Sequence, residues 1–346
     1  MTSIPTHESI AAECATHIQR RFARVVGRGT TALYVALRAL ALRDTPGEII
    51  LPDVTCSTVL DAVLLAGFTP IFADSTTDRF AMNADSIRRR VTPATRAVIL
   101  SHIFGYTNEA VDLGIPIIED AVQGLGGMAG GKPIGTLGDI AFTSFHPTKM
   151  INGQGGLVAT DDPALWDAIQ QVSLVDSVPP PEQVSTRYQH YFTQLAATRD
   201  MLIRPFDDRA ENVARIAAGW SRLAANVAAR NERARYLREG VADLRLTLPL
   251  TLPSIQPGDA IWRYTFAAPT LAVTRWILRH LQAAGLSGSA LYPSLSNLFE
   301  PNTTLASVEL APRLINLWVD DATDQAALDQ MIAVLHGVPR KFWGSS

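Results

Sequence analysis

Residues 115–162 read IPIIEDAVQGLGGMAGGKPIGTLGDIAFTSFHPTKMINGQGGLVATDD, and no other segment of the chain is as informative. An apolar run ends there in an acidic pair, Glu119 and Asp120, and Gln123 follows. Lys149 stands further along, among glycine-rich turns. A short apolar run that stops at charged residues predicts a buried strand whose last side chains cap a turn or reach a ligand.

Apolar runs of the same kind occur at residues 49–51, 70–73 and 97–100, and segments with helical spacing separate them. Short continuous apolar runs that alternate with helices indicate buried parallel strands with crossover helices. The fold class is therefore α/β, with a mostly parallel sheet. Ligands bind beyond the carboxyl ends of such strands. The polar residues that follow the runs are therefore candidate ligand-binding residues by position alone, although some will be caps or turn formers. They are Asp53, Asp74, His102 and Asp120.

The chain has 346 residues, which exceeds the size at which one hydrophobic core usually stops growing. We therefore expect a large domain over residues 1–240 and a small C-terminal α+β domain over residues 241–346. Helical periodicity predicts a helix at 163–172, a long connecting helix within 209–244, a strand at 263–267, and helices at 271–284 and 323–336.

Composition narrows the class of protein. Hydrophobic residues make up 47% of the chain and charged residues 18%. The formal net charge is -3, and residues of neither sign form a long continuous run. This balance argues against a nucleic-acid partner and against a polybasic membrane anchor. The two cysteines, Cys14 and Cys56, are far apart, so we expect neither a disulfide scaffold nor a metal site. Without a signal-peptide pattern or an apolar run of about 20 residues, we expect a cytoplasmic protein.

A site for pyridoxal phosphate (PLP) needs three kinds of group. It needs a lysine amine that burial keeps partly uncharged, and Lys149 can supply it. It needs a carboxylate that keeps the pyridine nitrogen protonated, and Asp120 can supply that. It also needs donors for a phosphate, which a turn before a helix provides. The candidate donors are Gly29, Thr30 and Thr31, which precede a helix expected at 32–42, and Ser144.

The chain resembles the DegT/DnrJ/EryC1/StrS family of PLP-dependent enzymes, which are best known as nucleotide-sugar aminotransferases. The resemblance is close over residues 27–160 and weak beyond them. The matching motifs are Ile-Glu-Asp-Ala-x-Gln at 118–123, Gly-x-x-Gly-Asp at 135–139, Ser-Phe-His-x-x-Lys at 144–149, Gly-Thr-Thr-Ala-Leu at 29–33, His-x-Phe-Gly at 102–105 and Tyr-Pro at 292–293.

This resemblance implies an aspartate-aminotransferase-like fold (PLP fold type I) and a homodimer with active sites at the interface. Lys149 would be the Schiff-base lysine and the proton shuttle, and Asp120 would pair with the ring nitrogen. Gln123 would lie beside the phenolate oxygen of the ring, and Ser144 and Thr30 would bind the phosphate. The substrate side would include Tyr292, and His102 and His146 would either contact substrate or pack beside the site.

The chain departs from the family pattern at three places. Cys56 stands where many members stack an aromatic residue on the cofactor ring, and it would either pack against the ring as a small hydrophobic residue or only be buried at the start of a helix. Leu291 replaces a histidine before the Tyr-Pro pair. The family's Gly-x-Asn-x-Arg segment, whose asparagine reaches the phosphate in the partner subunit, is not found within residues 173–212. Either another residue, such as Arg187 or Tyr188, substitutes for it, or the phosphate is held more weakly.

The expected function is an aminotransferase that moves an amino group from an amino acid, glutamate or glutamine, to a keto group. The acceptor would be a nucleotide-linked sugar or a related molecule of a specialised pathway. Two alternatives keep PLP, namely another reaction (elimination, aldol-type cleavage or cyclisation) and a catalytically silent PLP-binding or regulatory protein. A dinucleotide-dependent oxidoreductase is disfavoured because no GxGxxG motif follows the first strand.

Overall fold

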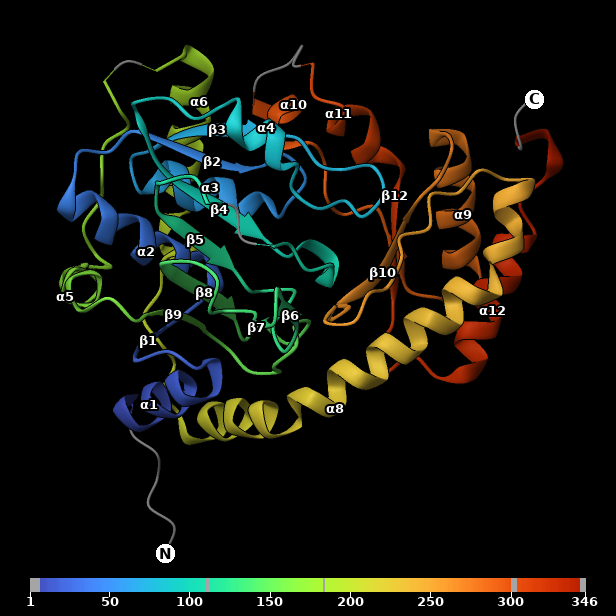
Figure 1. Ribbon diagram of the computed structural model, residues 1–346, viewed down its shortest axis with the longest axis horizontal. Helices are drawn as coiled ribbons and strands as arrows, with labels where there is room; N and C mark the ends of the chain where they lie inside the picture. The colour runs from blue at the N-terminus through green and yellow to red at the C-terminus, as the bar shows by residue number, and fades with distance from the viewer. Residues whose placement is uncertain (1–6, 110–111, 183, 300–303, 343–346) are drawn as a thin grey trace, which may run out of the picture.

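The computed structural model describes residues 7–109, 112–182, 184–299 and 304–342 (Figure 1). Its main feature is a seven-stranded sheet with the order β1-β9-β8-β5-β4-β2-β3. Strands β3, β2, β4, β5 and β8 are parallel to one another, and β9 and β1 complete the other edge in antiparallel pairing. The strands are β1 Phe22–Val26, β2 Glu48–Pro52, β3 Thr69–Ala73, β4 Thr95–Ser101, β5 Ile117–Asp120, β8 Ile140–Ser144 and β9 Gly156–Thr160.

The predicted α/β class with a mostly parallel sheet is confirmed. All four apolar runs that the sequence marked as strands are strands β2 to β5. Helix α2 packs against β8 and β9 and also contacts α3 and α5, so it covers one face of the sheet. Helices α1, α6 and α7 and the β6–β7 hairpin (Met128–Ala129 and Lys132–Pro133) were not predicted. The helices before the long connecting helix are α1 His7–Ile18, α2 Gly29–Arg43, α3 Ser57–Leu65, α4 Ala84–Arg88, α5 Pro163–Gln171, α6 Thr186–Ala197 and α7 Arg199–Leu202.

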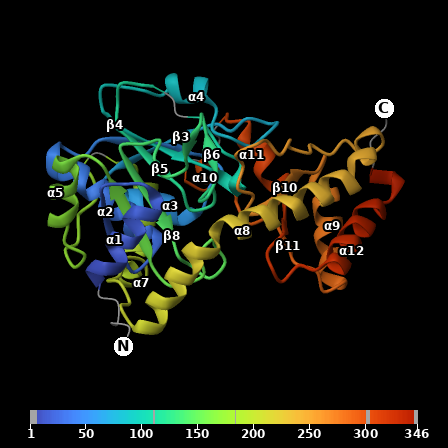
Figure 2. The same cartoon turned by 60° about the horizontal axis from the view of Figure 1, so that its bottom comes forward.

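Helix α8, Ala210–Gly240, is the long connecting helix (Figures 1 and 2). It contacts α1 beside the large sheet and α12 in the C-terminal part of the chain. The latter part contains an antiparallel sheet with the order β10-β12-β11. Its elements are β10 Arg263–Ala267, α9 Leu271–Ala283, β11 Gly288–Ser289, β12 Leu314–Trp318 and α12 Gln325–His336, with short helices α10 Leu295–Phe299 and α11 Ser307–Leu310 between β11 and β12.

The C-terminal part is not a separate unit in space. Residues 294–299 and 304–310, which we call the returning segment, pack back onto the large sheet, where Leu295 and Phe299 join its hydrophobic core. A second core cluster is continuous from Ile10 in α1 to Leu317 in β12. The two parts therefore share buried surface, and we propose the end of α8 as their boundary. No helix within the described residues has the length and apolarity needed to cross a membrane.

Candidate active site

A cavity of about 490 Å³ lies where β5 and β8 end and α2 begins. This is the position that a parallel sheet reserves for ligands, because the strand ends and the following turns converge there. Most of the predicted site residues line it, namely Gly29, Thr30, Cys56, Asp120, Gln123, Ser144, His146 and Lys149. Three of them, Thr31, His102 and Tyr292, do not line it.

Asp120 is the last residue of β5 and is 5% exposed. Its Oδ1 accepts a hydrogen bond from the backbone N–H of Val122 and its Oδ2 accepts one from the Ser101 hydroxyl, each at 3.0 Å. Burial raises the pKa of Asp120, against the opposing effects of these hydrogen bonds and of nearby positive charge. Within the described residues Asp120 has no ion-pair partner. It is thus a carboxyl group held in place by two hydrogen bonds, and a cation bound in the cavity would favour its charged form.

Lys149 is buried, and its Nζ lies 3.8 Å from the centre of the Trp262 ring. Burial lowers the pKa of Lys149 to about 8, and the positive charge of Arg263 adds to this effect. The indole N–H of Trp262 donates to the backbone oxygen of Thr148 at 2.5 Å, so the aromatic surface below the lysine is fixed. An amine with this pKa has a much larger uncharged fraction near neutral pH than an ordinary lysine, and the uncharged form can act as a nucleophile or a base.

Arg263 is a residue that the sequence did not single out. Its guanidinium carbon lies 3.9 Å from the centre of the Trp262 ring and 3.6 Å from that of Trp318. The side chain is buried, and its Nη1 has no hydrogen-bond partner among the described residues. Lys149 and Arg263 therefore contact the same indole, and their mutual repulsion favours the uncharged form of the lysine. Only the tertiary packing of β10 against β12 reveals this arrangement.

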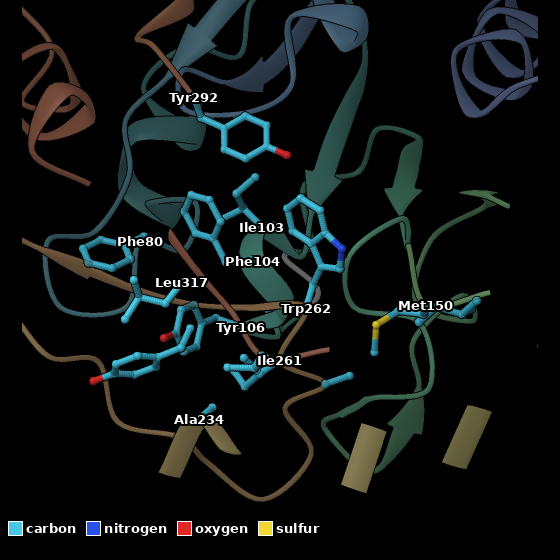
Figure 3. Packing of buried hydrophobic residues seen from close by; sticks show 14 of the residues in the cluster. Phe80, Ile103, Phe104, Tyr106, Met150, Ala234, Ile261, Trp262, Tyr292 and Leu317 are labelled. Carbon is cyan, nitrogen blue, oxygen red and sulfur yellow. The ribbon is translucent and has the colours of Figure 1, made fainter. Parts of the chain in front are cut away.

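Gln123 lines the cavity with an amide whose orientation is set by two partners. Its Oε1 accepts from the backbone N–H of Phe104 at 2.8 Å, and its Nε2 donates to the Tyr292 hydroxyl at 3.4 Å. Phe104 has a positive φ of 60°, which is rare for a bulky residue and aims its N–H at the glutamine. Tyr292 packs edge-on against Phe104 and Trp262, as Figure 3 shows, and so supports the site from outside the cavity lining.

The other end of the cavity is suited to an anion. Gly29 and Thr30 form the first turn of α2, whose backbone N–H groups have no partners within the helix. A Cβ at Gly29 would approach the Cβ of Ser144 to 2.8 Å, so glycine allows the helix end and β8 to meet. Thr31 is used differently, because its hydroxyl donates to the backbone oxygen of Leu202 and accepts from the N–H of Arg204.

The two histidines have different environments. His102 is fully buried, and its Nδ1 accepts from the backbone N–H of Asn108, which places its proton on Nε2, 3.1 Å from Glu119. It is therefore a structural residue beside the site. His146 lines the cavity, and burial together with the charges of Lys149 and Arg28 lowers its pKa. Of the two, His146 alone is placed to meet a substrate.

Glu119 precedes Asp120 but serves the fold. Its carboxylate accepts hydrogen bonds from the backbone N–H groups of Gly135, Leu137 and Gly138 as well as from His102. Burial alone would raise the pKa of Glu119, but the hydrogen bond from His102 and the backbone donors outweigh it and lower the pKa. A lowered folded-state pKa stabilises the fold above the ordinary carboxyl pKa, and that contribution is lost as the pH falls through the acidic range.

We therefore expect Glu119→Ala to lower the free energy of unfolding by about 3–5 kcal/mol, because it leaves buried donors and a histidine without an acceptor. Glu119→Gln, which keeps the shape but not the charge, should cost less. Both variants should also lose the part of the acid sensitivity that Glu119 contributes. Urea unfolding at neutral and acidic pH measures these effects, and an unchanged urea midpoint for Glu119→Ala would contradict the assignment.

Substitution for the missing asparagine segment by Arg187 or Tyr188 stays a prediction, because that segment would reach the phosphate in the partner subunit. Arg187 donates to the backbone oxygen of Leu298, and Tyr188 donates to that of Phe68, so both are engaged away from the cavity. Cys56 does line the cavity, at the N-terminus of α3, with its Sγ 3.2 Å from the Thr58 hydroxyl.

Asp53 and Asp74, which follow β2 and β3, bind the returning segment. Asp53 accepts from the backbone N–H of Ser296 and from the Ser307 hydroxyl, and Asp74 accepts from the N–H groups of Ala306 and Ser307. Their position after strands thus reflects a structural role, which is the second of the two readings that the sequence left open.

Part of the chain is similar in sequence to two bacterial enzymes. The chain is 35% identical over 159 residues to the GDP-perosamine synthase of Escherichia coli O157:H7, covering 44% of this chain and 43% of that protein. It is 37% identical over 147 residues to a UDP-N-acetyl-3-dehydro-alpha-D-glucosamine 3-aminotransferase of Acidithiobacillus ferrooxidans, covering 40% and 39%. The matched segments therefore span less than half the length of these relatives.

The fold has close structural counterparts. The PLP form of the Streptococcus pneumoniae protein Spr1654 superposes with a TM-score of 0.78 at 18% identity and covers 99% of this chain and 94% of that one. The family model of the DegT/DnrJ/EryC1/StrS aminotransferases matches residues 1–336. The chain belongs to the DegT/DnrJ/EryC1/StrS aminotransferase family.

Proposed function

We propose that the protein is a PLP-dependent aminotransferase that transfers an amino group from glutamate or glutamine to a keto group of a nucleotide-linked sugar. The observation that carries the proposal is one cavity that holds a lysine with a lowered pKa, a buried carboxylate without a cationic partner, and an anion-binding helix end. The acceptor class is supported by the names of the two curated relatives, which both act on nucleotide-linked sugars by those names.

The residues present fit PLP. Lys149 would hold the cofactor covalently through its amine, and Asp120 would keep a proton on the ring nitrogen. Ser144, Thr30 and the first amides of α2 would bind the phosphate. When bound, PLP supplies an electron-poor ring that delocalises the charge left after a proton leaves the carbon next to the amino group.

The chain's own residues account for proton movement and orientation. With PLP bound and the donor amine in its place, Lys149 would be a free base in a desolvated pocket, able to accept the donor α-proton in the first half of the reaction and to give a proton to the acceptor carbon in the second. The Trp262 ring, 3.8 Å from the amine, keeps the lysine in place while it is free. The hydrogen bond from Gln123 to Tyr292 would hold the glutamine amide in its orientation toward the cofactor ring.

The visible absorption spectrum tests this function. We expect purified protein with PLP to show the band of lysine-bound cofactor, and excess glutamate or glutamine to convert it to the band of the aminated cofactor. A band untouched by both donors would reject these donors and favour another PLP reaction or a silent binder. Absence of any cofactor band would reject the function.

The pKa of Lys149 makes the capture of PLP dependent on pH. Because the uncharged amine is the nucleophile, the rate at which the apo-protein gains the cofactor band should rise with pH and reach half its plateau at about 8. Arg263→Gln removes the repulsion that favours the neutral amine, so the midpoint should move to higher pH. Stopped-flow absorbance across neutral and alkaline pH measures both profiles, and identical midpoints would contradict the role given to Arg263.

We further propose a cytoplasmic homodimer with its active sites at the interface. The cavity opens beside Arg28, which holds the backbone of Met201, and the Met201 side chain is 65% exposed. The support for the homodimer is the family to which the chain belongs, since the resemblance to that family implies active sites at a subunit interface. Sedimentation equilibrium tests this proposal, and a monomer at micromolar concentration would reject it.

A further inference from the structure

Two arginines that no sequence motif marked, Arg28 and Arg204, line the cavity at its anion-binding end. Arg28 immediately precedes α2, whereas Arg204 follows α7, so the two are distant in sequence. Two backbone contacts join their segments. The N–H of Gly27 donates to the backbone oxygen of Arg204 at 2.8 Å, and the N–H of Arg204 donates to the Thr31 hydroxyl at 3.1 Å. Both arginines are therefore held beside the first turn of α2.

The contact between these segments is built into the chain. A Cβ at Gly27 would lie 2.4 Å from the backbone oxygen of Pro205 and 2.6 Å from that of Arg204, distances that no side chain tolerates. Glycine at this position thus lets the two backbones approach. On the other side, Arg28 donates from Nη1 to the backbone oxygen of Met201 at 2.9 Å, which fixes its side chain across the same junction.

Neither arginine forms an ion pair among the described residues, although Asp207, whose pKa is lowered by Arg209 and also by Arg204, lies near Arg204. In the part of the chain that the structure describes, neither guanidinium has a carboxylate within ion-pair distance. Asp120 is the one acidic residue of the cavity lining, and it lies at the end of β5. The positive charge of Arg28 also reaches His146, whose pKa it helps to lower. This end of the cavity, with two arginines and no carboxylate in its lining, is therefore suited to an anion.

We propose that Arg28 and Arg204 clamp the phosphate ester of the cofactor from within the same chain. The proposal rests on the proposed function, and the two arginines would take the place of the asparagine that family members supply from the partner subunit and that is not found in this chain within residues 173–212. A guanidinium presents several N–H donors in a planar fork that matches phosphate oxygens. Together with Thr30, Ser144 and the amides of α2, the two arginines neutralise a phosphate dianion without a group from a second subunit.

The test compares PLP with pyridoxal, which has the same ring and aldehyde but no phosphate. We would titrate apo-protein of the wild type, Arg28→Gln and Arg204→Gln with each compound and follow the cofactor band. Arg209→Gln is the matched control, because Arg209 lies in the same stretch of chain but is exposed and paired with Asp207. We expect each clamp variant to raise the Kd of PLP roughly tenfold to hundredfold, as loss of a charged hydrogen bond does, and to leave that of pyridoxal unchanged.

Several outcomes separate this proposal from its alternatives. Arg28→Lys and Arg204→Lys keep the charge without the fork, so an intermediate Kd supports the clamp and also covers the case in which a glutamine variant does not fold. If PLP and pyridoxal weaken equally, the clamp is overturned. If the Kd of PLP is unchanged while binding of UDP or GDP to the holoenzyme weakens, the arginines hold the phosphates of the acceptor instead, and the cofactor clamp is again overturned. Failure of the wild type to bind either compound would overturn the proposed function itself.

Discussion

Lys149→Ala is expected to abolish covalent attachment of PLP and to lower transamination by about 10³-fold or more, since both the nucleophile and the proton shuttle are lost. The fold should survive, because alanine in place of a lysine removes a buried amine and leaves no unpaired acceptor behind. The measurement is borohydride reduction of the holoenzyme followed by peptide mapping, alongside turnover with glutamate.

The chain itself offers the control for this experiment. It contains three lysines, Lys132, Lys149 and Lys341, so the labelled peptide is identified without ambiguity. Lys132 is exposed on β7, and Lys132→Ala should retain both the label and the activity. A reduced linkage that persists in Lys149→Ala at the same peptide would show that the assignment is wrong.

Asp120→Asn should bind PLP but lose turnover by roughly 10²- to 10³-fold, the size of effect seen when one preorganised electrostatic partner is removed. An asparagine keeps the contact with the Ser101 hydroxyl but carries no charge, so it cannot hold a proton on the ring nitrogen. Steady-state kinetics should show the loss in kcat, with a smaller change in KM.

The neighbouring residue sharpens this prediction. Glu119 and Asp120 are consecutive on β5, and their side chains therefore point to opposite sides of the strand. Glu119→Gln should change the free energy of unfolding and leave kcat nearly intact, whereas Asp120→Asn should do the reverse. Full turnover in Asp120→Asn would refute the role of the carboxylate as partner of the ring.

Much of the fold was predictable because local patterns carried it. The apolar runs of β2 to β5 are buried on both faces of the sheet, so their hydrophobicity is continuous and legible in the sequence. The strand at 263–267 has the bounds of β10, and the last helix starts two residues later than predicted. The Asp324 side chain accepts from the N–H of Ala327 and so sets that start.

Other elements could not be predicted from the sequence. Helix α1 has weak amphipathic patterning. Its residues Ile10 and Cys14 are buried in the same cluster as Trp220 of α8, whose indole N–H donates to the Cys14 sulfur. The returning segment looks like loop and short helix in the sequence. Its packing on the large sheet depends on Asp53 and Asp74, which are remote from it along the chain.

By itself, the sequence determined the α/β class, the family, and the lysine and aspartate that a PLP site needs, because these depend on short motifs and on local periodicity. Tertiary structure alone decided how the remaining polar residues are used. It buried His102 against Glu119, left His146 in the cavity, placed Arg263 on the indole beside Lys149, and brought Arg28 and Arg204 together. The physical reason is that charge compensation and burial depend on neighbours in space, which no local pattern of residues specifies.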